Sequence, residues 1–382
     1  MTSTLASPTP AADLAAEPPV LFEEQPAGAF RIGVATLNRP RQLNAINLEM
    51  CQLLLDRFRA WQSDDGVVLV VLRGAGDKGF SAGGDVADLV RRVRAGGPDR
   101  FVYGDSFFAV EYQLNLLIHH YRKPLLSLSH GINMGGGVGL TVGASHRVVS
   151  DRSRVAMPEI HIGLIPDVGG GFFLNRLPCG IGTVMALTGL TLNETDTLFT
   201  GLADWVVPRA HFDDLWSALR ALPWTGQARA DGALLTRLLQ DLSQALSQDL
   251  SQRPASAPPP SELLPRLDVL RAIAARPTAL EMRDALQAAA VADPWFKPWA
   301  TSLSQGSPTA AYLTLEYLRR AKTMSLAQVL DMDLRVTCAC QRAHDFPEGV
   351  RALLIDKDRQ PQWSPASFEA VDPAAVAAHF AE

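Results

Sequence analysis

The sequence predicts an α/β protein that continues into a helical C-terminal region. Between residues 30 and 157, short apolar segments alternate with glycine-rich turns and with segments of helical periodicity. Repeated strand–turn–helix units of this kind indicate an α/β core. Beyond Pro208 the strand patterns end, and leucines recur at helical spacing. The chain has 382 residues, of which 47% are hydrophobic and 20% charged, so it can bury a large core.

The N-terminal part of the chain is predicted to pass from disorder into the α/β core. Residues 1–20 are rich in Ala, Pro, Ser and Thr, and we expect a disordered lead-in. They lack the apolar centre of a signal peptide and the arginines of a transit peptide. Phe30–Leu37 has the partial alternation of a strand. Asn47 is placed to cap a helix that runs to Trp61, and the unbroken apolar run Val67–Leu72 indicates a strand buried on both sides.

The remaining strands of the core are short. Apolar segments predict strands at Leu125–Ser129, His146–Ser150 and Arg154–Met157, with one helix after Asp85 and another in the glycine-rich stretch between them. The apolar stretch 125–144 is not expected to span a membrane, because two polar side chains, His130 and Asn133, lie at its centre. We therefore assign residues 21–208 to one α/β core.

Residues 209–382 are predicted to be mainly helical. Six leucines fall on one helical stripe, which is more often core than a binding surface: Leu235, Leu238, Leu239, Leu242, Leu246 and Leu250. We expect this helix to stop at Pro254 and a proline-rich loop to occupy residues 254–260. Further helices are expected between residues 262 and 333, with breaks at four prolines: Pro277, Pro294, Pro298 and Pro308.

Charge and motif content exclude several classes of function. The net charge of −5 argues against a nucleic-acid-binding protein. Arg91–Arg94 is a basic cluster that we interpret as a solvated helix face, with contact to a phosphate group as the alternative. Four cysteines without zinc-ligand spacing predict neither a disulfide framework nor a metal site. No Walker A or dinucleotide-binding fingerprint and no nucleophile elbow is present, and we expect no separate cofactor and a cytoplasmic location.

Two glycine motifs carry the functional signal. Gly84 and Gly136 each follow an apolar strand at the start of a helix, where backbone N–H groups have no partner within the helix. Two such donors together can hold a thioester oxygen and the oxyanion that forms on attack. Two carboxylates follow in the sequence, Glu159 after an apolar strand and Asp167 in a glycine-rich segment. A partly desolvated carboxylate has a raised pKa, which suits a base or nucleophile.

These motifs resemble those of the crotonase (enoyl-CoA hydratase/isomerase) superfamily, and within it the 3-hydroxyisobutyryl-CoA hydrolases. The similarity extends from about Leu21 to Trp363. It includes Leu37–Pro40 with Leu43–Ala45, the segment Ile165–Gly171, and Arg351–Asp358 near the C-terminus. The resemblance implies a spiral of ββα units, C-terminal helices that contribute to subunit contacts, and a possible homo-oligomer.

The resemblance also assigns roles to individual residues. Gly84 and Gly136 match the oxyanion-hole donors and Glu159 the catalytic glutamate. Asp167 and Glu111 match acidic positions of the hydrolase branch. From the residues alone, a turn residue is the alternative for Asp167, and a solvated helix face is the preferred interpretation of Glu111. The catalytic set is predicted as Glu159, Asp167, Gly84 and Gly136; the substrate set as Glu111, Gly136, Glu159 and Asp167; and the CoA-binding set as Arg41, Asn44, Ser81, Gly83, Gly84 and Asp85.

The residue at position 139 separates the possible reactions. Hydratases of the superfamily carry a second glutamate three residues after the middle glycine of the oxyanion hole, and this chain has Gly139 there. Hydration needs one group to activate water and another to deliver a proton. We therefore expect hydrolysis of a short 3-hydroxyacyl-CoA, namely 3-hydroxyisobutyryl-CoA from valine breakdown. The alternatives are an enoyl-CoA hydratase or isomerase and a non-catalytic CoA-binding scaffold; no nucleic-acid or membrane partner is expected.

Overall fold

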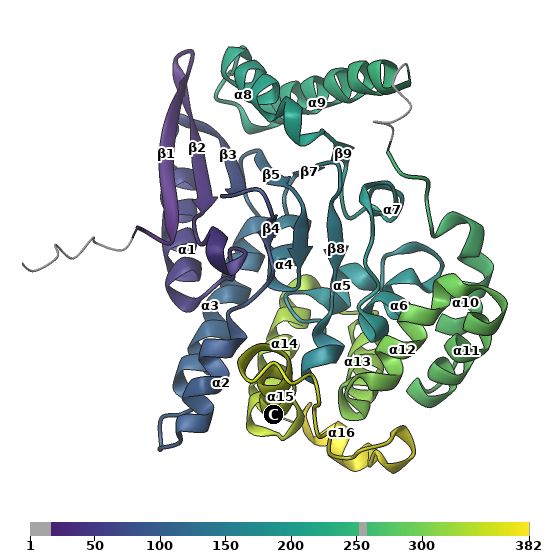
Figure 1. Ribbon diagram of the computed structural model, residues 1–382. Helices are drawn as coiled ribbons and strands as arrows, with labels where there is room; N and C mark the ends of the chain where they lie inside the picture. The colour runs from purple at the N-terminus through teal and green to yellow at the C-terminus, as the bar shows by residue number, and fades with distance from the viewer. Residues whose placement is uncertain (1–16, 252–257, 382) are drawn as a thin grey trace, which may run out of the picture.

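The computed structural model describes residues 17–251 and 258–381. Its larger sheet contains the predicted strands except the one near residues 154–157, which belongs to a second sheet. The six strands of the larger sheet lie in the order β1-β2-β3-β5-β7-β9 (Figure 1). The first pair is antiparallel and the others are parallel. The strands are β1 (Val20–Ala27), β2 (Phe30–Leu37), β3 (Val67–Gly74), β5 (Leu125–Ser129), β7 (His146–Val149) and β9 (Trp205–Val206).

A second, three-stranded parallel sheet builds the spiral. Its strands are β4 (Gly79–Ser81), β6 (Ile132–Met134) and β8 (Arg154–Ala156). The chain passes three times from a strand of the larger sheet into one of these and then into helical structure. Because the strands of the small sheet are parallel, the segments that follow them meet at one edge. Gly84, Gly136 and Glu159 all lie in those three segments.

Of the helices in the first two hundred residues, α1, α4 and α7 pack against strands, and the others pack mainly against helices. Asn47 caps α1 by accepting a hydrogen bond from the Met50 amide, as predicted. The others in this part are α2 to α7. The bounds are α1 (Leu48–Ser63), α2 (Val86–Ala95), α3 (Val102–His119), α4 (Gly136–Val142), α5 (Gly170–Leu174), α6 (Ile181–Thr188) and α7 (Glu194–Phe199).

The leucine stripe packs in the core, as expected. It lies on α9 (Ala228–Ser251), which together with α8 (Phe212–Ala221) covers one face of the larger sheet (Figure 1). Leu235, Leu239 and Leu246 are buried there against residues of the sheet. The predicted stop at Pro254 and the first part of the proline-rich loop lie outside the described residues. So do residues 1–16 of the predicted lead-in, whose last residue, Val20, already belongs to β1.

The other C-terminal helices share the main core with the spiral. Pro277, Pro294 and Pro308 separate helices as predicted, but the break expected at Pro298 is wrong. Pro298 lies in the first turn of α12, where a missing N–H costs no helical hydrogen bond. The helices are α10 (Leu267–Ala274), α11 (Ala279–Ala292), α12 (Lys297–Gln305), α13 (Pro308–Ala321), α14 (Leu326–Arg342), α15 (Asp345–Val350) and α16 (Pro373–Ala378), and a π-helical turn spans Arg351–Ile355.

In the described part of the chain, every helix is too short or too polar to cross a bilayer. This includes the segment 125–144. It is divided among β5, β6 and the short helix α4, and its His130 and Asn133 are buried within the protein.

Candidate active site

A cavity of about 320 Å³ lies where the small sheet ends. Both glycine motifs, three carboxylates and several apolar side chains line it. The polar part consists of Gly83, Gly84, Gly135, Gly136, Glu111, Glu159 and Asp167, and the apolar part includes Val86, Phe107, Phe108, Ile162, Leu164, Leu353 and Leu354. The structure thus brings the predicted catalytic and substrate-binding residues into one cavity.

The two predicted oxyanion donors lie close together in the wall of this cavity. Gly136 is the first residue of α4, so its N–H has no acceptor within the helix. The amides on either side of Gly84 bond to Ser81 Oγ and to the Ile46 carbonyl, but no acceptor for the Gly84 amide occurs in the described residues. A methyl group placed on Gly136 would lie 3.4 Å from the Gly84 nitrogen. The two N–H groups therefore offer a site for one oxygen atom.

Glu159 and Glu111 reach this site from two different elements. Glu159 begins the 3₁₀ turn after β8, and its Oε1 lies 2.7 Å from the position that a Cβ on Gly135 would take. Glu111 lies on α3 with its Oε1 2.6 Å from the corresponding position on Gly136. It is only 2% exposed, so the solvated helix face considered from the residues alone is wrong. Glycine at 135 and 136 leaves room for both carboxylates.

Asp167 reaches the cavity from the loop that precedes α5. Its Oδ2 accepts a hydrogen bond of 2.6 Å from the Tyr112 hydroxyl. Asp167 is buried and lies in a tight turn. Its backbone forms part of the turn, and its carboxylate lines the same cavity as Glu111 and Glu159.

The surroundings of the three carboxylates raise their pKa values and so favour the protonated forms. Burial, together with the charges of Asp167 and Glu159, raises the pKa of Glu111 well above its usual value. Burial and the charge of Asp167 likewise raise the pKa of Glu159. Burial raises the pKa of Asp167 to about 6, although its bond to Tyr112 opposes the shift. A cluster of this kind can hold a protonated and an ionised carboxyl side by side at neutral pH, so it can act as acid and as base.

Gly139 has no room for a side chain. A Cβ there would lie 2.5 Å from the Cβ of Val168 and 3.1 Å from the Nδ2 of Asn115. Val168 fills this space from a left-handed backbone conformation with φ of 53°. The space beside Gly139 on α4 is thus filled by an apolar side chain, and both residues line a neighbouring cavity of about 380 Å³.

The predicted CoA-binding residues divide into two groups. Asn44 and Ser81 are fully buried, and their polar atoms bond to backbone groups of neighbouring loops. These two residues shape the loops and offer no free group to a ligand. Asp85 forms an ion pair of 2.9 Å with Arg39. Arg41 is exposed near the same loop, and Gly83 lines the cavity, so their contact with CoA stays a prediction.

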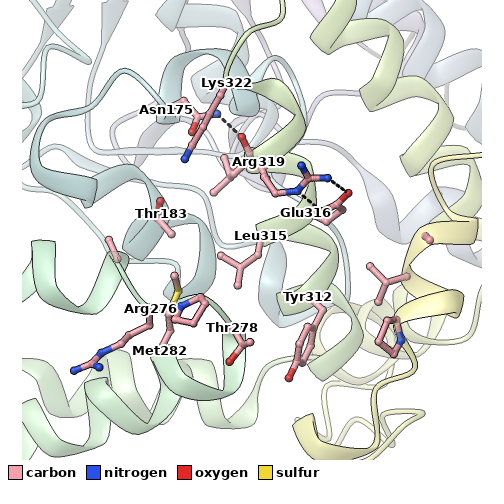
Figure 2. Close-up of a pocket in the computed structure, with 16 residues that line it drawn as sticks. Asn175, Thr183, Arg276, Thr278, Met282, Tyr312, Leu315, Glu316, Arg319 and Lys322 are labelled. Atoms are coloured by element: carbon pink, nitrogen blue, oxygen red, sulfur yellow. Dashed lines mark hydrogen bonds and ion pairs between the residues drawn. The ribbon is translucent and has the colours of Figure 1, made fainter.

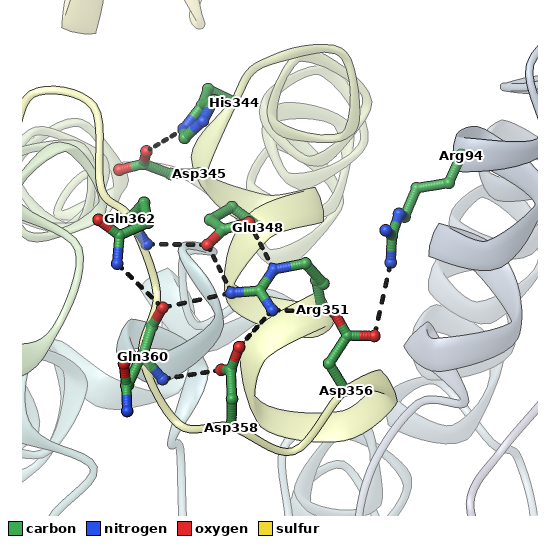
Figure 3. A network of polar contacts seen from close by, with 9 residues as sticks. All are labelled: Arg94, His344, Asp345, Glu348, Arg351, Asp356, Asp358, Gln360 and Gln362. Atoms are coloured by element: carbon green, nitrogen blue, oxygen red, sulfur yellow. Dashed lines mark hydrogen bonds and ion pairs between the residues drawn. The ribbon is translucent and has the colours of Figure 1, made fainter.

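The apolar cover of the cavity comes from a C-terminal segment that sequence reasoning had not placed there. Leu353 and Leu354 lie on the π-helical turn and line the cavity. Arg351 holds this turn by bonding to the carboxylates of Glu348, Asp356 and Asp358 (Figure 3). Arg94, from the basic cluster on α2, lies 3.9 Å from Asp356 in the same network. The Arg351–Asp358 motif was the available signal, but its position over the cavity depends on tertiary packing.

The histidines near these motifs form hydrogen bonds with neighbouring groups of the protein. His130 bonds to the Gly76 carbonyl and His146 to Ser145 and Thr236. His161 touches the cavity, but its Nε2 lies 2.6 Å from Ser302 Oγ. All four cysteines are free thiols, and Cys51 and Cys340 are buried.

The geometry can be compared with known proteins. Residues 32–380 match the family model described as enoyl-CoA hydratase/isomerase. The chain is 36% identical to the mitochondrial 3-hydroxyisobutyryl-CoA hydrolase of Gallus gallus, over 92% of this chain and 86% of that protein. It is 34% identical to 3-hydroxyisobutyryl-CoA hydrolase 1 of Arabidopsis thaliana, over 97% of this chain and 93% of that protein.

Two solved structures share the whole fold. One is described as a carnitinyl-CoA dehydratase from Mycobacterium thermoresistibile, with a TM-score of 0.81 and 35% identity over 95% of this chain and 96% of that one. The other is described as an enoyl-CoA hydratase from Rhodobacter sphaeroides 2.4.1, with a TM-score of 0.79 and 36% identity over 95% and 97%. The predicted α/β spiral with a helical C-terminal region is confirmed.

One sequence-based prediction is contradicted by these relatives. The proteins from Gallus gallus, Danio rerio and Rattus norvegicus are all described as mitochondrial. The cytoplasmic location, which rested on the composition of the first twenty residues, is therefore wrong by this comparison, and those residues lie largely outside the described structure.

Proposed function

Because this chain belongs to the enoyl-CoA hydratase/isomerase family, we propose that it is a hydrolase that cleaves 3-hydroxyisobutyryl-CoA to 3-hydroxyisobutyrate and CoA. This is a step in valine breakdown. The observation that carries the proposal is the cavity itself. Two glycine N–H groups converge beside three buried carboxylates, while Val168 closes the space at Gly139. The curated relatives with this activity in their names cover most of the chain.

The thioester carbonyl binds between the two glycine amides. Its oxygen accepts hydrogen bonds from Gly84 and Gly136 N–H, and these bonds strengthen as negative charge develops on the oxygen. Donors of this kind are worth about 3–4 kcal/mol of transition-state stabilisation each. The apolar side chains Phe107, Phe108 and Leu353 exclude water from the rest of the cavity, which strengthens the polar contacts.

Glu159 supplies the attacking group. It either takes a proton from a water molecule that adds to the carbonyl carbon, or adds to that carbon itself and is released by water in a second step. In both routes the C–S bond breaks, and water supplies the hydroxyl of the new carboxylic acid. CoA leaves as a thiol after a carboxyl of the cluster returns the proton. CoA is part of the substrate, and no separate cofactor enters these steps.

Glu111 and Asp167 position the reacting groups. Both lie in the same cavity as Glu159, and the charge of Asp167 acts on both other carboxylates. They hold the 3-hydroxyl of the substrate, the water or Glu159 itself. The exposed Arg41 is available to the CoA phosphates.

The closure of Gly139 separates hydrolysis from the first alternative. The two solved structures named above are described as a dehydratase and a hydratase, so overall similarity does not decide the reaction. In this chain, a side chain at position 139 would collide with Val168. The second acid that hydratases of the superfamily carry at this position is therefore absent, and the other carboxylates of the cavity, Glu111 and Asp167, come from different elements.

The free-energy cost of burying unpaired carboxylate oxygens in the cavity argues against a non-catalytic CoA-binding scaffold. Glu111 Oε1 and Glu159 Oε2 are buried, and neither has a hydrogen-bond partner in the described residues. Burying such atoms without a partner is unfavourable by about 1–3 kcal/mol each. A protein that only holds CoA gains nothing from these carboxylates.

Release of free thiol from a panel of acyl-CoAs tests the assignment. We expect CoA release from 3-hydroxyisobutyryl-CoA and little or no hydration of crotonyl-CoA by the same preparation. Crotonyl-CoA hydration without thioester cleavage would overturn the hydrolase assignment in favour of a hydratase. Tight binding of both esters without turnover would overturn it in favour of a scaffold.

Asp167→Asn distinguishes a site carboxylate from a turn residue. The pKa of Asp167 is about 6 in the folded protein and near 3.8 in the unfolded chain. The folded state is therefore disfavoured by this group above pH 6, and the effect vanishes as the pH falls below 3.8. Asparagine keeps an acceptor for Tyr112 and removes the charge. We expect a melting temperature at pH 8 equal to or above that of the wild type, and about 10²-fold slower hydrolysis.

Thermal melts at pH 8 and pH 4 and rates on the same preparation check this expectation. The stability difference between variant and wild type should shrink at the lower pH. A lower melting temperature with near-normal turnover would assign Asp167 to the turn alone.

A further inference from the structure

The turn that carries Asp167 has an unusual backbone. Val168 has φ of 53° and Gly169 has φ of 84°, so two successive residues lie in the left-handed region. Glycine adopts that region freely, but for a β-branched residue such as valine it is a rare and strained conformation. Strain of this kind persists where the surrounding structure holds it in place, and it is concentrated at functional sites.

Two side chains from distant helices hold this turn. Asp333, on α14, accepts a hydrogen bond of 2.7 Å from the Gly169 amide through its Oδ2. Tyr317, on α13, accepts one of 2.7 Å from the Gly171 amide through its hydroxyl. Neither helix belongs to the spiral that carries Gly84, Gly136 and Glu159. The turn is therefore fixed from outside the sheet edge that forms the rest of the cavity.

The helix after the turn is anchored on the same side. Asn175 Nδ2 donates to the Gly171 carbonyl at 2.7 Å and to the Leu318 carbonyl of α13 at 2.8 Å. Figure 2 shows Asn175 at the border of a separate cavity of about 500 Å³, to which α13 presents Tyr312 and Glu316. Helix α13 thus has one side in that cavity and carries Tyr317 toward the turn.

Burial of the Asp333 carboxyl at this position is unfavourable for the stability of the folded protein. Its side chain is 0% exposed, and its Oδ1 has no hydrogen-bond partner in the described residues. It forms no ion pair there with an Arg, Lys or His. Burial also raises the pKa of Asp333 well above its usual value. The proposed reaction does not use this carboxyl directly, yet one of its oxygens binds the amide two residues after Asp167.

We propose that Asp333 is a positioning residue for hydrolysis. By accepting the Gly169 N–H, and with Tyr317 on the Gly171 N–H, it holds the left-handed turn. That turn has two consequences: it presents Asp167 to the cavity that holds Glu111 and Glu159, and it seats Val168 against Gly139 of α4. The inference rests on the proposed function and adds a device that sets the geometry of its third carboxylate.

The test compares a variant that removes the Asp333 carboxyl, a variant that keeps an acceptor there, and a variant that relieves the backbone strain at Val168. Asp333→Ala should lower kcat by about 10²-fold with little change in KM, because a shift of the order of 1 Å in a positioning group has that effect. Asp333→Asn keeps an acceptor for Gly169 and should stay within a few-fold of the wild type. Val168→Gly relaxes the turn and should recover part of the activity lost in Asp333→Ala.

A measurement without substrate separates this proposal from the proposed function. Hydrogen–deuterium exchange of the backbone amides of residues 165–175 should become about tenfold faster in Asp333→Ala and in Tyr317→Phe. Tyr312→Phe, on the same helix but facing the other cavity, is the matched control and should exchange like the wild type. If Asp333→Ala does not fold, Tyr317→Phe carries the test.

Unchanged exchange in Tyr317→Phe and in Asp333→Ala, where it folds, would overturn the positioning role. Equal losses of kcat in Asp333→Ala and Asp333→Asn would also overturn it. So would a further loss of activity when Val168→Gly is combined with Asp333→Ala. A wild-type protein that releases no CoA from any ester while the exchange differences appear would reject the hydrolase function and leave the turn assignment standing.

Discussion

Glu159→Gln should lower kcat for hydrolysis of 3-hydroxyisobutyryl-CoA by about 10²–10⁴-fold, with CoA-ester binding retained. Glutamine has nearly the size of glutamate but can neither accept a proton at neutral pH nor add to the thioester carbon. Glu159 lies in the turn after β8 and lines the cavity with the two glycine donors, and among the described residues its buried Oε2 has no hydrogen-bond partner. Free thiol release measures the rate, and calorimetry with a CoA ester measures binding.

Stability of this variant provides a second check. Burial and the nearby charge of Asp167 raise the pKa of Glu159, so the ionised carboxylate disfavours the folded state at pH values above that pKa. Removing the charge should leave the melting temperature at pH 8 unchanged or higher. Glu194→Gln is a matched control, because Glu194 is also buried but accepts from the Arg152 amide outside the cavity. Hydrolysis by Glu159→Gln within tenfold of the wild type would remove Glu159 from the mechanism.

Much of the fold could be predicted because its signals are local. Val67–Leu72 is a continuous apolar run and Leu125–Ser129 is a short leucine-rich segment, and both are strands with two buried faces in the parallel sheet. Asn47 caps α1 through an amide three residues away. Pro298 was misread because the same residue breaks a helix interior but is tolerated in a first turn. The leucine stripe predicted a buried face of α9 but not which sheet face it covers.

The candidate site was predictable only in part, for a related reason. Gly84, Gly136 and Glu159 each follow a strand of one parallel sheet, so their convergence depends on topology that the motifs encode. The residues that were missed act over long separations in the sequence. Tyr112 bonds to Asp167 across 55 positions, and Asp333 bonds to Gly169 across 164. No periodicity or motif relates such pairs.

Buried polar side chains near a motif also mislead sequence reasoning. Asn44 and Ser81 belong to the segments that resemble the superfamily, and both were expected to contact CoA. In the structure their polar groups are consumed by backbone partners, including the Gly79 carbonyl and the Gly83 amide. A motif residue can therefore be required for the shape of a loop without touching the ligand, and only burial and hydrogen bonding separate the two cases.

Gly136→Ala should lower kcat by about 10²–10³-fold, as much as the loss of one oxyanion donor, because the variant keeps its N–H but the added methyl group blocks access to it. The added methyl group would lie 2.6 Å from Glu111 Oε1 and 3.4 Å from the Gly84 nitrogen, in the space where the carbonyl oxygen must bind. Gly136 does not have a positive φ and begins α4, so alanine suits its backbone. This variant is cleaner than Gly136→Pro, which removes the N–H but also endangers the helix.

The control for this change is Gly232→Ala, a helical glycine in α9 whose added Cβ would meet nothing closer than 4.0 Å. Circular dichroism should be native for both variants, and thiol release should fall in Gly136→Ala alone. Because the methyl group blocks the oxygen site and displaces Glu111, KM should rise as kcat falls. Turnover by a folded Gly136→Ala protein within a few-fold of the wild type would mean that the carbonyl oxygen binds elsewhere. The two glycine amides would then be packing features of the strand ends and not donors to the reaction.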